Sequence, residues 1–191
     1  MSNARNIARH IPDSNGKIQL PSQVAGTLPD ANAPSGSVIQ IVSTTFADTF
    51  TYSNTNVWSS NFMTASITPS RSDSKILITV HVGCFGYTAE VAHTASFRIL
   101  RDSTVVGGGT PSGSRQAASF RDFTQTDSNH GRNGSFTHLD SPNTTSAITY
   151  GVQVNPQGYI VCINRTGNDD NNSNAWGVRC ASSITLTEIA A

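Results

Sequence analysis

Charged side chains are scarce in this sequence of 191 residues, and the few present cancel. Twelve Lys and Arg face twelve Asp and Glu, so the formal net charge is zero. A chain without a basic excess lacks the charge that holds a nucleic-acid backbone, so no nucleic-acid partner is expected. No stretch approaches the roughly 20 apolar residues of a membrane-spanning helix, and the N-terminus has no apolar signal-peptide core. We therefore expect neither a membrane partner nor a secretion signal.

Cysteine is also rare. Cys84, Cys162 and Cys180 leave at least one thiol unpaired and show no C-x-x-C spacing. Each falls within a predicted strand, where a free cysteine behaves as a small buried hydrophobe. Buried thiols are the favoured interpretation, with one disulfide or metal ligation as alternatives. Assembly in a reducing cytoplasm fits this usage.

Motifs for catalysis are missing as well. The sequence has no G-x-S-x-G, and the glycines of 107–113 match no nucleotide-binding loop. Its five histidines follow no zinc spacing, although three copies of His81 or His138 would gather if either lay on a three-fold axis. Asp122 and Asp127 offer paired carboxylates without a wider acidic cleft. We predict no enzyme, no catalytic residue, no cofactor and no metal site.

Small polar residues are abundant instead. Ser, Thr and Asn number 25, 22 and 16, and 36% of the residues are hydrophobic. Ser, Thr and Asn side chains hydrogen-bond locally to the backbone, which favours turns and strand surfaces over helix interiors. The chain is long enough to bury one core. These features indicate one globular, β-rich domain with very little helix.

Alternating hydrophobicity marks the strands. In 75–82 the residues Ile76, Ile78, Val80 and Val82 share one face, which is the period of a half-buried strand. Gly83 and Gly86 are expected to end this strand. Further strands are predicted at 37–43, 45–53, 61–67, 95–101, 105–106, 115–124, 134–140, 148–154, 159–164 and 182–189. Turn residues at 155–158 predict a hairpin between 148–154 and 159–164. The fold class is therefore all-β, with a single antiparallel jelly-roll or β-sandwich body at 37–191.

Residues 1–36 form a separate segment. Four prolines forbid a long helix or a central strand, and the sparse apolar residues make no core. We expect an extended N-terminal anchoring arm that lies on another subunit. The residues predicted to contact its partner are Arg5, Ile7, Arg9, Ile11, Ile18 and Leu20.

A loop rich in Asn and Asp at 167–174 invites a calcium interpretation, but its spacing does not follow an EF-hand. A solvated loop tip is the simpler interpretation. At the end of a projecting body this loop would be placed to touch a saccharide. The predicted contacts are Asp169, Asp170, Asn172 and Trp176.

Five segments in order resemble a β-rich domain of tailed-bacteriophage virion proteins, often from marine phages and cyanophages. They are SGSVIQIVSTTFADTF (35–50), SITPSRSDSKILITVHV (66–82), FRILRDSTVVGGG (97–109), SNHGRNGSFTHLDSPNTTSAITYGVQV (128–154) and SSITLTEIAA (182–191). The resemblance implies a homotrimeric virion structural protein, assembled in the host cytoplasm. It favours a tail fibre or spike held by the arm to tail or baseplate proteins. The alternatives are a capsid cement or decoration protein (head fibre) on the major capsid protein, and a carbohydrate-binding module for host attachment through a surface glycan.

Overall fold

The computed structural model describes residues 30, 33–88, 94–122, 127–174 and 177–191. The chain divides into two units, residues 1–32 and 33–191. All of the first unit except Asp30 lies outside the described residues, and every strand of the described residues belongs to the second unit. The described residues contain no α-helix and no helix able to span a membrane. The prediction of very low helix content is confirmed.

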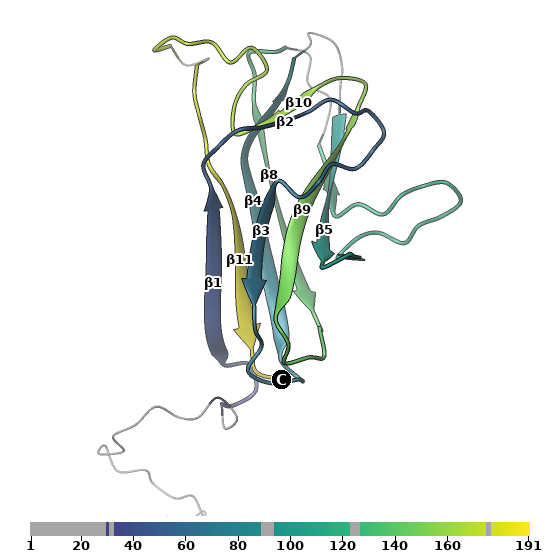
Figure 1. Ribbon diagram of the computed structural model, residues 1–191, viewed down its shortest axis with the longest axis vertical. Coiled ribbons are helices and arrows are strands. Elements are labelled where there is room, and N and C mark those ends of the chain that lie inside the picture. The colour runs from purple at the N-terminus through teal and green to yellow at the C-terminus, as the bar shows by residue number, and fades with distance from the viewer. Residues whose placement is uncertain (1–29, 31–32, 89–93, 123–126, 175–176) are drawn as a thin grey trace, which may run out of the picture. The chain divides into compact units, whose positions relative to one another are not determined.

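Eleven strands build the second unit (Figure 1). They are β1 (Val38–Phe46), β2 (Phe50–Tyr52), β3 (Met63–Ile67), β4 (Lys75–Tyr87), β5 (Thr94–Arg101), β6 (Thr104–Val106), β7 (Phe120–Arg121), β8 (Arg132–Asp140), β9 (Ile148–Gln157), β10 (Val161–Ile163) and β11 (Ser182–Ile189).

The strands form two antiparallel sheets. The first has the order β1–β11–β4–β8, and β10 and β2 continue it beside the far end of β4. The second has the order β3–β9–β5, with β6 and β7 on the free edge of β5. From β3 onward the chain passes repeatedly from one sheet to the other, which is the connectivity of a jelly roll. The predicted all-β sandwich is therefore confirmed.

The core lies between the two sheets. The predicted face of β4, with Ile76, Ile78 and Val80, is fully buried there. An aromatic cluster fills the centre, in which Phe97 stacks on Phe120 with ring centroids 4.6 Å apart. Offset contacts of this kind add to the free energy gained from burying apolar area.

Gly83 and Gly86 do not end β4, which runs on to Tyr87. A Cβ on Gly83 would lie 2.1 Å from the Ala181 carbonyl oxygen, and one on Gly86 would lie 3.0 Å from the Gly167 nitrogen. The expected strand end was wrong because these glycines admit a neighbouring backbone, a use of glycine that strands share with turns. Near this point β4 exchanges its neighbour β11 for β10.

The predicted hairpin of 148–154 with 159–164 is also wrong. Strand β9 continues to Gln157 and pairs with β3 and β5, whereas β10 pairs with β4 and β2 in the other sheet. Pro156 is tolerated in β9 because β3 pairs with β9 only as far as Val152. Beyond that residue one edge of β9 is free of a ladder, and proline is compatible with such an edge.

Two further strand predictions are only partly correct. The strand expected at 45–53 is divided between β1 and β2, and within Arg115–Asp122 only the two residues of β7 are strand. All three cysteines are free, as favoured, and Cys84 and Cys162 are buried. Cys180 is half-buried and lies outside the strands, contrary to the prediction.

Two buried acids tie strands together. The Asp140 carboxylate accepts hydrogen bonds from Arg101 Nη1 at 2.8 Å and from the Tyr150 hydroxyl at 2.7 Å, which links β5, β8 and β9. Glu188 of β11 is fully buried and accepts hydrogen bonds from Gln40 Nε2 at 2.6 Å and from the Ser70 amide at 2.8 Å. Burial alone would raise the pKa of Glu188, but these hydrogen bonds outweigh it and hold the pKa below its ordinary value.

Candidate functional site

The outer side of the first sheet presents a surface of hydroxyl and apolar side chains, which we call the hydroxyl face. Strand pairing places its outward residues in three rows across β1, β11, β4 and β8. The rows are Ile41–Thr187–Leu77–Leu139, Ser43–Thr185–Thr79–Thr137 and Thr45–Ser183–His81–Ser135. Eight of these twelve residues are serine or threonine.

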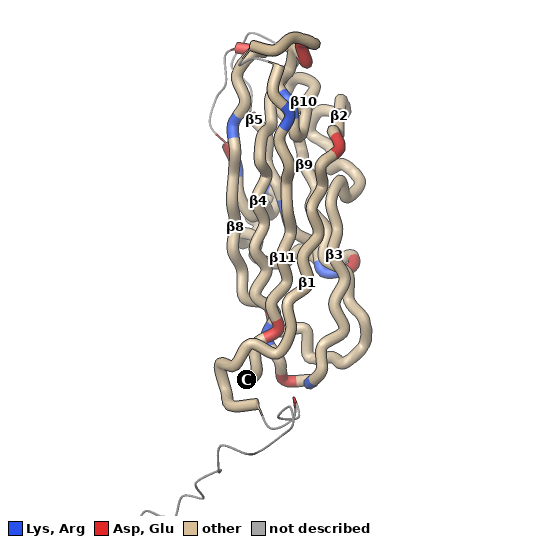
Figure 2. Tube along the Cα trace, turned by 90° about the vertical axis from the view of Figure 1, so that its left-hand side faces the viewer, with Lys and Arg blue, Asp and Glu red and all other residues tan. Residues whose placement is uncertain are grey.

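Among the twelve residues of the hydroxyl face, only His81 is ionisable. Figure 2 looks onto β8, β4, β11 and β1, whose charged residues lie near the strand ends. Three large apolar side chains are open to solvent along this side of the sheet, with Val38, Ile41 and Leu139 at 56%, 62% and 51% exposure. A solvent-exposed apolar row without charge is typical of a surface that is covered in an assembly.

The hydroxyls also pair with one another. Ser43 Oγ lies 2.9 Å from Thr185 Oγ1, and His81 Nδ1 lies 3.0 Å from Ser135 Oγ. His81 therefore lies on the Leu77 and Thr79 side of its strand, as predicted. His138 points to the inner side of β8 and stacks on Phe136, so the two histidines do not share a face. Within the described ranges no three His, Cys, Asp or Glu side chains gather as metal ligands do.

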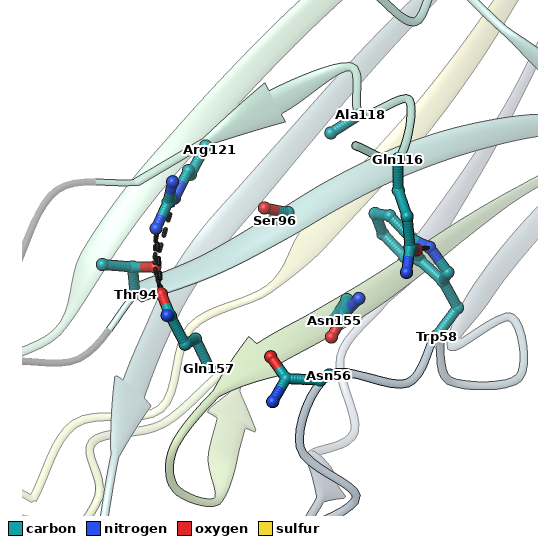
Figure 3. Close-up of a pocket in the computed structure, with 9 residues that line it drawn as sticks. All are labelled: Asn56, Trp58, Thr94, Ser96, Gln116, Ala118, Arg121, Asn155 and Gln157. Carbon is teal, nitrogen blue, oxygen red and sulfur yellow. Dashed lines mark hydrogen bonds between the residues drawn. The ribbon is translucent and has the colours of Figure 1, made fainter. Parts of the chain in front are cut away.

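A polar groove lies on the outer side of the second sheet, with a volume of about 220 Å³ (Figure 3). Its floor comes from β5, β7 and β9, and its walls come from the 53–62 loop and the 107–119 loop. The lining residues are Asn56, Trp58, Thr94, Ser96, Gln116, Ala118, Arg121, Asn155 and Gln157. None of them is acidic.

One arginine, Arg121, lines the groove, and a second, Arg98, lies against its Trp58 wall. Arg121 donates from Nη2 to Thr94 Oγ1 at 2.8 Å and to Gln157 Oε1 at 3.0 Å. Arg98 places its guanidinium 4.3 Å from the centre of the Trp58 ring and donates to Gln153 Oε1. Burial lowers the pKa of Arg98. Both guanidinium groups have neutral hydrogen-bond partners among the described residues.

Trp58 is fixed from two sides. Its Nε1–H donates to Gln116 Oε1, and the Arg98 guanidinium covers the ring. The groove itself was missed because its residues come from segments far apart in the chain and form no motif.

The predicted saccharide loop at 167–174 lies entirely within the described residues. The Asp169 carboxylate lies 2.5 Å from Arg179 Nη2 and 3.8 Å from Arg165 Nε. These two ion pairs stabilise the loop. Asp170 and Asn172 are exposed. Trp176 lies outside the described residues, as do the six predicted arm contacts Arg5, Ile7, Arg9, Ile11, Ile18 and Leu20. Saccharide binding by this loop and anchoring by the arm stay predictions.

Comparison with known proteins gives little. No family model matches the chain, and no curated protein matches it. A solved structure of infectious bursal disease virus, Gx strain, shares 13% identity at a TM-score of 0.40 and covers 82% of this chain. The VP2 subviral particle of that virus shares 14% identity at a TM-score of 0.38 and covers 79% of this chain. The match spans 38% of the viral chain in both cases. Scores this low carry no argument about function.

Proposed function

We propose that the protein is a structural component of a bacteriophage particle that assembles with copies of itself through the hydroxyl face. The hydroxyl face, in which His81 is the only ionisable residue among twelve, is the observation that carries this proposal. In a symmetric assembly, side chains near the rotation axis meet their own copies, so a charged residue there would repel itself. Serine and threonine hydroxyls donate and accept hydrogen bonds, so identical copies can pair.

The finer proposal is a homotrimeric tail fibre or spike, anchored by residues 1–36 and assembled in the host cytoplasm. The resemblance of the five segments to tailed-phage proteins supports it, and the three free thiols fit folding under reducing conditions. Three arms per trimer would raise one another's effective concentration at the particle, so weak single contacts would suffice to hold the body. A structural role needs no catalytic group.

Light scattering coupled to size-exclusion chromatography tests the self-association. We expect the full chain to elute as a trimer and Thr79→Arg, at the middle of the hydroxyl face, to elute as a folded monomer. Thr64→Arg is the matched control, because Thr64 is exposed on β3 of the other sheet. A monomeric wild-type chain, or a Thr79→Arg variant that still forms the trimer, would refute the role of this face.

Cross-linking mass spectrometry of assembled particles tests the location. Links from residues 1–36 to tail or baseplate proteins are expected for a fibre. Links to the major capsid protein would instead identify a capsid cement or decoration protein. Deleting residues 1–30 should leave a folded trimer that no longer joins the particle, and full incorporation of the truncated chain would disprove anchoring by the arm.

A further inference from the structure

The polar groove of the second sheet is open when the hydroxyl face is covered, because the outer sides of the two sheets face opposite directions. It lies between the 53–62 loop and the 107–119 loop, over the floor of β5 and β9. Self-association through the first sheet therefore leaves the groove available to a ligand.

Several polar side chains of the groove have no hydrogen-bond partner among the described residues. The side chains of Asn56, Ser96 and Asn155 make no hydrogen bond within the described residues, although all three line the groove. Ser96 and Asn155 are directly opposite in the β5–β9 register, so they stand side by side on the floor. An amide offers both a donor and an acceptor, as does a hydroxyl. Such groups suit a ligand whose own surface is made of hydroxyls.

One guanidinium in the groove keeps N–H donors without a partner among the described residues. Arg121 uses Nε and Nη2 for Thr94 and Gln157, which leaves the two N–H groups of Nη1 without a partner among the described residues. The adjacent Asp122 cannot neutralise it by direct pairing, because its carboxylate faces the core and accepts from Tyr87 and the Ala95 amide. A guanidinium with free donors and no paired carboxylate favours an anionic ligand group, with a carboxylate as the best geometric match.

The charge, the aromatic wall and the volume of the groove together indicate which class of ligand it would bind. A single free guanidinium among neutral amides and hydroxyls is too little charge for a nucleic-acid backbone, which needs several phosphate contacts. The fixed Trp58 ring supplies an aromatic wall, and aromatic surface beside polar groups suits a ligand with both apolar and polar edges. The volume of about 220 Å³ equals roughly seven waters, which is of the order of one sugar ring with its hydroxyls.

We propose that this groove binds a saccharide that carries a carboxylate, such as a uronate or sialic acid unit. The carboxylate of the sugar accepts hydrogen bonds from Arg121 Nη1. The ring hydroxyls bond to Asn155, Ser96 and Asn56, and one edge of the ring lies along Trp58. Neighbouring sugars of a longer chain leave the groove through its open ends.

Saturation-transfer NMR and calorimetry with the full chain test this proposal. The probes are 3′-sialyllactose against lactose, and trigalacturonate against the uncharged galactose trimer. At least one acidic probe is expected to bind at millimolar concentration or better, about tenfold more tightly than its neutral counterpart. If neither acidic probe binds, or if the neutral sugars bind equally well, the proposal is wrong.

Variants locate the site. Arg121→Gln should weaken binding of the acidic probe about tenfold or more, because a charge-assisted hydrogen bond is lost. Asn155→Ala should weaken it about fivefold. Arg115→Gln is the matched control, since Arg115 is an exposed arginine that does not line the groove. Thermal melting establishes that each variant is folded. Unchanged binding in both Arg121→Gln and Asn155→Ala would exclude this groove, even if the sugar binds elsewhere.

Discussion

Replacing Gly83 by alanine should destabilise the sandwich strongly, although the change adds one methyl group. The new Cβ would lie 2.1 Å from the Ala181 carbonyl oxygen, and real Cβ contacts are essentially never closer than 3.0 Å. The two backbones must therefore move apart by about 0.9 Å. That movement also strains the 3.1 Å hydrogen bond from the Gly83 amide to Ser182 Oγ. Overpacking costs about 1–3 kcal/mol and a weakened hydrogen bond about 1 kcal/mol, which together give about 2–4 kcal/mol.

Thermal unfolding followed by circular dichroism measures this effect. For a domain of this size each kcal/mol shifts Tm by about 2–4 °C, so Gly83→Ala should lower Tm by about 5–15 °C. Gly109→Ala is the matched control, because its Cβ meets nothing within 4 Å and its φ is not positive. That variant should melt with the wild type or slightly above it, since alanine restricts the unfolded chain. Equal Tm values for the two variants would refute the close approach at Gly83.

Three further predictions concern buried polar groups. Glu188→Gln should lose about 2 kcal/mol at neutral pH, because two hydrogen bonds to a buried carboxylate weaken. The folded pKa of Glu188 lies below the ordinary 4.5, so its contribution to stability is present above that pH and is lost as the pH falls through the folded pKa. In urea titrations the deficit of Glu188→Gln should therefore shrink as the pH is lowered below 4.5. Tyr150→Phe removes the hydrogen bond to Asp140 while Arg101 remains, and should cost about 1–2 kcal/mol in the same titration. Burial and the Cys180 thiol raise the pKa of Cys84 to about 12. Because maleimide reacts with the thiolate, at about pH 8 it should modify Cys84 about a thousandfold more slowly than an ordinary thiol of pKa 9. Mass spectrometry of the native protein after reaction measures this rate.

Local alternation was enough to predict the strands with one buried side. The strand at 182–189 was predicted with the bounds that it has in the fold, because its alternate residues Ile184 and Leu186 face the core. The far end of β4 was missed because the sequence around Gly83 does not reveal a backbone almost a hundred residues away. The hairpin predicted for β9 and β10 was wrong for the same reason. A turn signal shows where the chain reverses but not which strand each segment will pair with.

The candidate surfaces were less accessible to prediction. The sides of β4 were assigned correctly, so Thr79 and His81 were known to share a face. The rows that continue this face across β8 and β11 depend on strand register, which the sequence does not show. The groove is formed by an edge strand and two loops. Arg121 and Asn155 come together in it only because β7 and β9 both pair with β5. The sequence drew attention to the conspicuous Asn and Asp loop instead.

Pairing of the first strand with the last has a practical consequence. The Gly36 amide donates to the Ala190 carbonyl at 2.8 Å, and the Ala190 amide donates to the Ser37 carbonyl at 2.9 Å. Both ends of the sandwich domain therefore leave from one corner of the first sheet. A short linker between them, with new termini cut into the exposed loop around Gly109, would yield a circular permutant. A tag or cargo fused after Ala191 would likewise emerge beside Ala33, away from the groove floor.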